Sequence, residues 1–193
     1  TDPVARTGAV MKAPLAGTAG GPPTTLASGQ DGPHGIAVDG SNVYWTNQGD
    51  GFDPDGSVMK VPLAGGTPTT LASGLTSPWE IALDATSAYW TSNSQGTVMK
   101  VPLGGGTPTT LATAQAVAGG IAVVGTSVYW GSYEDYTPAD TYGTIVKVPS
   151  SGGAITTLSS SLQDFPTEIA VNATNVFWTN DDTNGGVKTV ASE

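Results

Sequence analysis

The sequence predicts an all-β fold made from one unit that is used again and again along the chain. An aromatic pair recurs roughly every 40 to 48 residues, at Tyr44-Trp45, Tyr89-Trp90, Tyr129-Trp130 and Phe177-Trp178. Each unit holds four short runs of β-forming residues, and no helical periodicity competes with them. Four strands in a repeat of this length are typical of one blade of a β-propeller, so the expected fold is a propeller of four-stranded antiparallel blades.

The four expected strands can be assigned in order. Strand A is Ile-Ala-Val or a close variant at residues 36–38, 81–83, 121–123 and 169–171, and strand B carries the aromatic pair. Strand C is Val-Met-Lys-Val or a close variant at 58–61, 98–101 and 145–148, and strand D is Thr-Thr-Leu at 69–71, 109–111 and 156–158. Turns rich in Gly, Pro, Asn and Asp separate them, as strand ends require.

The expected organisation is a single domain, 1–193, with about four blades. Residues 30–73, 74–113 and 114–160 form complete blades, while 1–29 supplies only strands C and D and 161–193 only strands A, B and C. These unequal ends favour a fragment of a larger, six-bladed ring. In a closed four-bladed ring, the alternative, the last strands A and B would join the first strands C and D. Open edge strands also predict self-association.

The repeat resembles a known family. Pro33-His34-Gly35 before strand A, followed by Tyr44-Trp45-Thr46-Asn47, looks like the YWTD propeller repeat of the low-density-lipoprotein-receptor type. It is also similar to NHL and TolB-like propellers, over nearly the whole chain. Residues that depart from the family's Asp are Asn47, Ser92, Ser132 and Asn180. The resemblance implies a secreted or cell-surface bacterial propeller that binds proteins, peptides or glycans, since only a few members are enzymes.

Composition excludes several classes of function. The 193 residues contain no cysteine, which removes disulfides and thiolate metal sites. No apolar run is long enough to span a membrane, so membrane insertion is not expected. The formal net charge of −10 argues against a nucleic-acid partner, which needs clustered Lys and Arg.

The repeat also places the charges. Five lysines are expected at one equivalent position of strand C, as a solvated ladder: Lys12, Lys60, Lys100, Lys147 and Lys188. Most acidic residues fall in the B–C and D–A loops, at one end of the blades: Asp2, Asp31, Asp50, Asp53, Asp55, Glu80, Glu134, Asp135, Asp140, Asp164, Glu168, Asp181 and Asp182. Such a face steers a partner with a basic contact surface, and its attraction should weaken with salt.

Five residues are candidates for ligand binding: His34, Trp79, Glu80, Tyr133 and Glu168. Glu80 and Glu168 alternate with glycines at the inner end of strand A, so they are either paired carboxylates for acid–base work or caps for backbone amides. Trp79 is either a recognition aromatic or packs against the next blade. No catalytic motif is present, so a binding module is expected. An enzyme at the channel mouth and a structural assembly module are the alternatives.

One loop is a candidate cation site. Asp50, Asp53 and Asp55 lie within six residues in the first long B–C loop, where Gly51 and Pro54 shape a tight turn. Ca²⁺ is the cofactor that three carboxylates suggest, with remaining oxygens from carbonyls, waters or the nearby Asp181-Asp182. The match to an EF-hand loop is poor, because Gly51 stands at its first ligand position. The alternative is a solvated acidic turn.

Overall fold

The computed structural model describes residues 7–115, 117–133, 143–162, 165–181 and 186–191, and it confirms an all-β fold. One short 3-10 turn, η1 (Gly17–Gly20), is the helical element of these residues, and no helix among them is long and apolar enough to cross a membrane. The strands are β1 (Thr7–Lys12), β2 (Thr24–Asp31), β3 (Pro33–Val38), β4 (Asn42–Asn47), β5 (Gly56–Pro62), β6 (Thr69–Leu75), β7 (Pro78–Leu83), β8 (Ser87–Ser92), β9 (Thr97–Pro102), β10 (Thr109–Ala112), β11 (Val117–Val124), β12 (Ser127–Tyr133), β13 (Gly143–Pro149), β14 (Thr156–Leu162), β15 (Phe165–Val171), β16 (Asn175–Asp181) and β17 (Gly186–Ala191).

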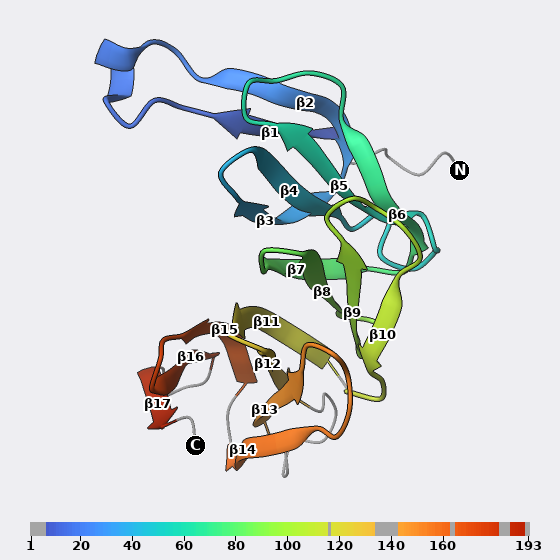
Figure 1. Ribbon diagram of the computed structural model, residues 1–193, viewed down its shortest axis with the longest axis vertical. Helices are drawn as coiled ribbons and strands as arrows, with labels where there is room; N and C mark the ends of the chain where they lie inside the picture. Colours follow the sequence, from blue (N-terminus) through green and yellow to red (C-terminus); the bar gives the residue numbers. More distant parts are fainter. Residues whose placement is uncertain (1–6, 116, 134–142, 163–164, 182–185, 192–193) are drawn as a thin grey trace.

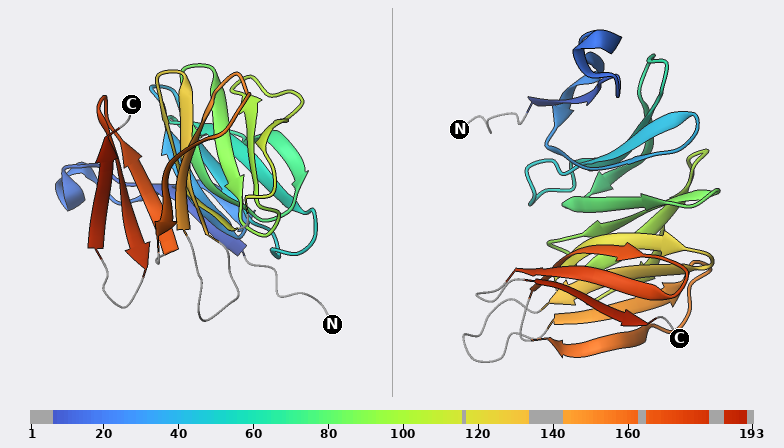
Figure 2. Two further views of the ribbon diagram at one scale, coloured as in Figure 1. Left: turned by 90° about the horizontal axis from the view of Figure 1, so that it is seen from below. Right: turned by 90° about the vertical axis from the view of Figure 1, so that its left-hand side faces the viewer.

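The strands form consecutive antiparallel sheets, as propeller blades do. Three sheets have four strands, in the orders β3-β4-β5-β6, β7-β8-β9-β10 and β11-β12-β13-β14. They are flanked by the two-stranded sheet β1-β2 and the three-stranded sheet β15-β16-β17. Figure 1 shows the sheets following one another around an open arc, with β3, β7, β11 and β15 on its inner side. Figure 2 shows them stacked face to face from the N-terminal to the C-terminal sheet.

The arc does not close on itself. In the described residues β16 pairs with β15 and β17, and β1 pairs with β2, so the two terminal sheets share no strand. The closed four-bladed ring considered from the sequence is therefore wrong for this structure. Its premise was that β16 would pair with β1, and β17 already occupies that edge of β16.

Apolar side chains between neighbouring blades form the core. Tyr44 on β4 packs in one cluster with Ile81 and Trp90 of the next blade, and Tyr89 packs in the same way with Trp130. The buried aromatic residues that are at most 1% exposed are Tyr44, Trp45, Tyr89, Trp90 and Trp130. The recurring aromatic pair thus faces both neighbours, because adjacent residues of a strand point to opposite faces of the sheet.

Close approach of the inner strands explains why glycine alternates with glutamate. A Cβ on Gly35 would lie 2.6 Å from the Trp79 carbonyl oxygen, and a Cβ on Gly120 would lie 2.8 Å from the Glu168 Cα. Only glycine fits where the backbone of the next blade comes so near. The glycines of this alternation therefore have a packing cause.

The turn between strands A and B is built around one acidic residue. The Asp39 carboxylate accepts hydrogen bonds from the amides of Ser41 and Asn42, each at 2.7 Å, and from the Tyr44 hydroxyl at 2.8 Å. These bonds, with the Ser41 amide first, lower the pKa of Asp39. Burial, reinforced by the bond to Asp39, raises the pKa of Tyr44 to about 12. Asp39 is thus occupied by the turn and contributes little to ligand binding.

The same turn in the last blade is built around an amide in place of the acid. Asn172 replaces the aspartate and still accepts the amides of Thr174 and Asn175, at 2.9 and 2.8 Å. Phe177 stands there in place of tyrosine, and a phenyl ring has no hydroxyl to donate. The neutral side-chain amide of Asn172 is therefore sufficient to accept the two backbone donors, because no tyrosine hydroxyl is present as a third donor.

The lysines of strand C connect blades and are not merely a solvated ladder. The Nζ atoms of Lys12, Lys60 and Lys100 donate to the carbonyl oxygens of Leu63, Leu103 and Ser150, at 2.7, 2.6 and 2.5 Å. Each acceptor lies just after strand C of the following blade, so each lysine ties two blades together.

The assignment of Lys188 to this set is wrong by one residue. Lys60 and Lys100 pair with Tyr44 and Tyr89, whereas the partner of Phe177 is Thr189. Lys188 pairs with Trp178, the position of Met59 and Met99. The error arose because the last strand C has Lys188 and Thr189 where β5 and β9 have Met and Lys, so alignment on lysine alone shifts the register by one residue.

Candidate functional site

A pocket opens at the inner ends of the blades. Its cavity volume is about 240 Å³, and its lining residues are His34, Trp79, Asn93, Gly119, Tyr133, Thr167 and Glu168. They come from β3, β7, β11, β12 and β15 and from the loop after β8. The pocket therefore gathers four of the five predicted ligand-binding residues, and Glu80 contacts it through His34.

His34, Trp79 and Glu80 form one wall. The His34 and Trp79 rings are stacked, with centroids 3.5 Å apart and planes 28° from parallel. The His34 Nδ1 lies 3.2 Å from the Glu80 Oε1, and the two side chains are 31% and 22% exposed. Trp79 thus packs on the preceding blade. The stack holds the imidazole in place, and both residues line the cavity.

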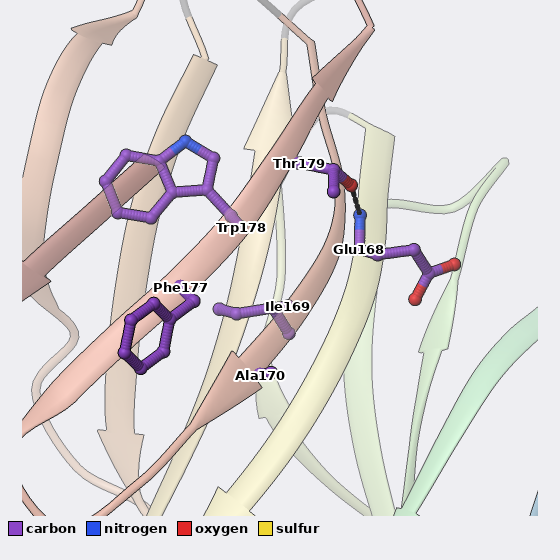
Figure 3. A pocket seen from close by; sticks show the side chains of 6 residues that line it. All are labelled: Glu168, Ile169, Ala170, Phe177, Trp178 and Thr179. Atoms are coloured by element: carbon purple, nitrogen blue, oxygen red, sulfur yellow. Dashed lines mark hydrogen bonds between the residues drawn. The ribbon is translucent and has the colours of Figure 1, made fainter. Parts of the chain in front are cut away.

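Glu168 lies on β15, and strand β11 of the blade before it separates β15 from β7, which carries Glu80. Gly119 and Gly120 of β11 lie between β7 and β15, so the intervening strand presents no side chain at these two positions. Burial of part of the Glu168 carboxyl raises its pKa, Glu80 raises it further, and His34 acts in the opposite direction. Figure 3 shows the carboxylate directed away from Phe177 and Trp178, while the Glu168 amide donates to the Thr179 hydroxyl at 3.2 Å.

Equivalent threonines of β4 and β8 hold the backbone of this site by hydrogen bonds. The Thr46 hydroxyl accepts from the Gly35 amide at 3.0 Å and donates to the Trp79 carbonyl at 2.5 Å. The Thr91 hydroxyl likewise accepts from the Glu80 amide at 3.3 Å and donates to the Gly119 carbonyl at 2.9 Å. Both threonines are fully buried. Each threonine hydroxyl therefore connects the inner strand of its own blade to the inner strand of the next blade.

Tyr133 closes one end of the pocket. It makes an edge-to-face contact with Phe165 at the start of β15, with ring centroids 5.1 Å apart and planes at 89°. This contact links the blade of β12 to the following one and orients the tyrosine ring.

Three lining residues were not predicted from the sequence: Asn93, Gly119 and Thr167. For Gly119 and Thr167, the sequence repeat contained a signal. His34, Trp79, Gly119 and Thr167 occupy one equivalent position, immediately before the alternating glycine or glutamate. All four line the same pocket, so the repeat itself would have found Gly119 and Thr167. Asn93 stands three residues after Trp90, as Tyr133 stands three residues after Trp130, so the repeat also relates Asn93 to a predicted residue of the pocket.

The acidic loop uses its carboxylates internally. Asp50 Oδ1 accepts from the amides of Phe52 and Asp53 at 2.8 Å, and the Asp55 carboxylate accepts from the Asp50 amide at 3.2 to 3.3 Å. Among the described residues no three His, Asp or Glu side chains are placed together to hold a metal ion. The Ca²⁺ site at Asp50, Asp53 and Asp55 remains a prediction, and binding would require these oxygens to turn outward.

The acidic end of the blades is only partly within the described residues. Asp31, Asp50, Asp53, Asp55, Glu80 and Glu168 belong to it, whereas Asp39 and Asp84 occupy the A–B turns at the other end. Asp2, Glu134, Asp135, Asp140, Asp164 and Asp182 lie outside the described residues, as does the side chain of Asp181. The pocket therefore sits at the end of the blades to which the repeat assigns most of the acidic residues.

Fold and site together define a repeat β-propeller array with a pocket on its inner strands. No protein-family model matches the chain, and no curated protein matches it. Solved structures do. A chain of a nidogen–laminin complex aligns with a TM-score of 0.72 and 22% identity over 91% of this chain and 68% of that one. The TolB protein of Agrobacterium tumefaciens aligns with a TM-score of 0.68 and 15% identity over 94% and 69%.

A streptogramin B lyase aligns with a TM-score of 0.58 and 14% identity over 83% of this chain and 54% of that one. At these identities the likeness concerns the fold alone. It confirms the expected resemblance to YWTD, NHL and TolB-like propellers at that level. The chain spans about two thirds of the first two proteins and about half of the lyase.

Proposed function

We propose that this chain is a secreted or cell-surface binding module whose inner-strand pocket receives a cationic group from a protein, peptide or glycan partner with a basic contact face. The observation that carries the proposal is the convergence of His34, Trp79, Tyr133 and Glu168 from separate blades on one cavity of about 240 Å³. Side chains from elements far apart in the sequence meet there because the blades are stacked in order.

The chemistry of the pocket favours a cation over other ligands. Glu168 lines the pocket, and the Glu80 carboxylate lies 3.2 Å from the His34 imidazole that also lines it, so two carboxylates are near the cavity. Trp79 offers an aromatic face, which attracts an ammonium or guanidinium group. A guanidinium can stack on an aromatic ring and donate to a carboxylate at the same time, so an arginine side chain fits this combination best.

The fold is compatible with a docking role. One similar structure is a chain of a nidogen–laminin complex, in which a propeller-type protein meets another protein. Loops and strand ends at one end of a propeller provide a broad surface around a central pocket. The acidic residues of the loops around that pocket would steer a basic partner toward it, and salt would weaken the attraction.

An acid–base enzyme is the second candidate, and one observation favours it. The raised pKa of Glu168, with Glu80 as the neighbouring carboxylate, is the arrangement that separates a proton donor from a proton acceptor. A similar structure is an enzyme, the streptogramin B lyase. If this candidate is right, Glu168→Gln abolishes turnover of a substrate while leaving its binding measurable.

The binding proposal is tested with blocked pentapeptides that carry a central arginine or its neutral isostere citrulline. Isothermal titration should show tighter binding of the arginine peptide, and Glu168→Gln should weaken that binding about tenfold, or about 1.4 kcal/mol. Asp53→Asn is the matched control, because it removes one acidic charge from an exposed loop outside the pocket. Its effect should be less than twofold.

Two results would reject the pocket as the cation site. In the first, the arginine and citrulline peptides bind equally well. In the second, Asp53→Asn weakens binding as much as Glu168→Gln does, which would mean that general charge and not the pocket attracts the peptide.

A further inference from the structure

The two nitrogens of the His34 imidazole have different surroundings. Nδ1 lies 3.2 Å from the Glu80 Oε1, whereas Nε2 has no hydrogen-bond or ion-pair partner among the residues that the structure describes. The stack on Trp79, with ring centroids 3.5 Å apart, holds the imidazole in this orientation. The two nitrogens lie on opposite sides of Cε1, so a ring that turns Nδ1 toward Glu80 directs Nε2 away from it.

The contact with Glu80 determines which nitrogen of the neutral ring carries the hydrogen. An ionised carboxylate only accepts hydrogen bonds, and a neutral imidazole has one N–H donor and one acceptor nitrogen. The hydrogen bond made by one ring nitrogen therefore fixes the state of the other. With Glu80 as the acceptor, the hydrogen lies on Nδ1 and the lone pair on Nε2.

His34 shares its cavity with a second group that accepts hydrogen bonds. His34 and Glu168 both line the pocket of about 240 Å³, and the charge of His34 influences the pKa of Glu168. The Glu168 amide donates to Thr179, but the oxygens of its carboxylate have no hydrogen-bond or ion-pair partner in the described part of the chain. The pocket thus offers acceptors from β3 and from β15 to the same ligand.

Acceptors at two places distinguish between cations of equal charge. A quaternary ammonium has no N–H group, so an aromatic face and nearby negative charge are all that attract it. A guanidinium is planar and has five N–H donors, so it can stack on Trp79 and donate to more than one acceptor at the same time. The pair of acceptors therefore favours a cation that carries N–H donors.

We propose that Glu80 is a positioning residue that holds the hydrogen of neutral His34 on Nδ1, so that His34 Nε2 accepts a hydrogen bond from the cationic group in the pocket. The ligand class is then a guanidinium or a primary ammonium, as on an arginine or lysine side chain, and not a quaternary ammonium. The ligand part of this inference rests on the proposed function, whereas the position of the hydrogen is a property of the free protein.

Nitrogen NMR of the free protein tests the position of the hydrogen. His34 is the sole histidine of the chain, so labelling histidine with nitrogen-15 gives one pair of ring signals. In alkaline buffer, where an imidazole is neutral, a long-range proton–nitrogen correlation should find the hydrogen on Nδ1. Glu80→Ala should lose most of this form. Asp53→Ala is the matched control, because it removes a carboxylate from an exposed loop outside the pocket, and it should keep the hydrogen on Nδ1.

Two NMR results would overturn the role of Glu80. A wild-type ring with its hydrogen on Nε2 would have no acceptor to offer to a ligand. A hydrogen that stays on Nδ1 in Glu80→Ala would show that another group fixes it. Circular dichroism checks that both variants remain folded, and the wild-type result does not depend on either variant.

Peptide selectivity tests the ligand class. Blocked pentapeptides with a central arginine or a central trimethyl-lysine carry the same charge, but only arginine has N–H donors in its cationic group. The wild type should bind the arginine peptide at least about tenfold more tightly, the effect of one hydrogen bond to a charged group. Glu80→Ala should weaken binding of both peptides through the lost charge and should also reduce the preference for arginine severalfold. Asp53→Ala should keep the preference.

Each outcome of the peptide experiment has one meaning. Equal affinity of the wild type for the two peptides would overturn the acceptor role of His34 Nε2. An arginine preference that is unchanged in Glu80→Ala would overturn the link between Glu80 and ligand choice. If no peptide binds, the proposed function and the ligand part of this inference are both rejected, and the NMR result alone decides whether Glu80 positions His34.

Discussion

Replacing Gly120 by alanine is expected to destabilise the fold by about 3 kcal/mol or more, because overpacking against backbone cannot be relieved by a side-chain rotation. The new Cβ would lie 2.8 Å from both the Glu168 Cα and the Thr167 carbonyl oxygen. The blades of β11 and β15 would have to separate. Urea unfolding followed by tryptophan fluorescence measures the change.

Gly104→Ala is the control for the loss of glycine flexibility. Nothing lies within 4 Å of the position of its Cβ. Its free energy of unfolding should stay within about 0.5 kcal/mol of the wild type, as exposed substitutions usually do. If Gly120→Ala proves as mild as Gly104→Ala, the inner strands are not in the close contact described here.

Trp130→Ala should lower the free energy of unfolding by about 3 to 5 kcal/mol, the usual cost of removing a large buried aromatic side chain. Trp130 is fully buried, and Tyr89 of the preceding blade packs in the same cluster. The cavity would open between two blades, where neither sheet can collapse to fill it. Thermal and urea unfolding give the magnitude.

Trp79→Ala provides the comparison for a tryptophan that lines the pocket. Trp79 is only partly buried and contacts His34 by stacking. We expect its loss to cost about 1 kcal/mol, in the range of an aromatic pair contact, and to impair arginine-peptide binding. Equal destabilisation by both variants would mean that Trp79 belongs to the core and not to a recognition surface.

The fold was predictable because one pattern is repeated. The aromatic pair gives strand B, the Ile-Ala-Val run gives strand A, and strict alternation assigns their two faces. The register of β17 was not predictable from the lysine alone, since Thr189 occupies the position opposite Phe177. A shift of one residue in a strand moves every side chain to the other face, so short imperfect repeats are where such errors arise.

Four residues that line the candidate pocket were singled out from the sequence, but the geometry of the pocket was not predictable. His34, Trp79, Glu80, Tyr133 and Glu168 were singled out as residue types at loop and strand ends. The sequence could not show that His34 would stack on Trp79, because stacking depends on the angle between successive blades. Nor could it show how closely the backbone of Gly119 and Gly120 would approach the strand that carries Glu168.

The acidic loop shows the opposite case, in which spacing suggested more chemistry than the structure displays. Three aspartates within six residues are a plausible ligand set for Ca²⁺. In the structure Asp50 and Asp55 accept amides of their own loop, which short acidic side chains do readily in turns. Their local role is sufficient to explain why aspartate stands at these two positions.

The proposed cation binding should depend on pH because of the electrostatics of the pocket. The raised pKa of Glu168 means that its charged form is disfavoured in the free protein. The ionised carboxylate is the form that attracts a cation, so affinity should rise as the pH increases through this raised pKa. By linkage, a bound cation should lower the pKa of Glu168 by favouring its charged form.

The pKa of Glu168 therefore tests most directly that the inner-strand pocket is a cation site. Carboxyl-carbon NMR titration should find it above the usual range of a glutamate in the free protein. Saturating arginine peptide should lower it, while the citrulline peptide at the same concentration should leave it unchanged. A Glu168 pKa that does not respond to saturating arginine peptide would contradict the proposed site.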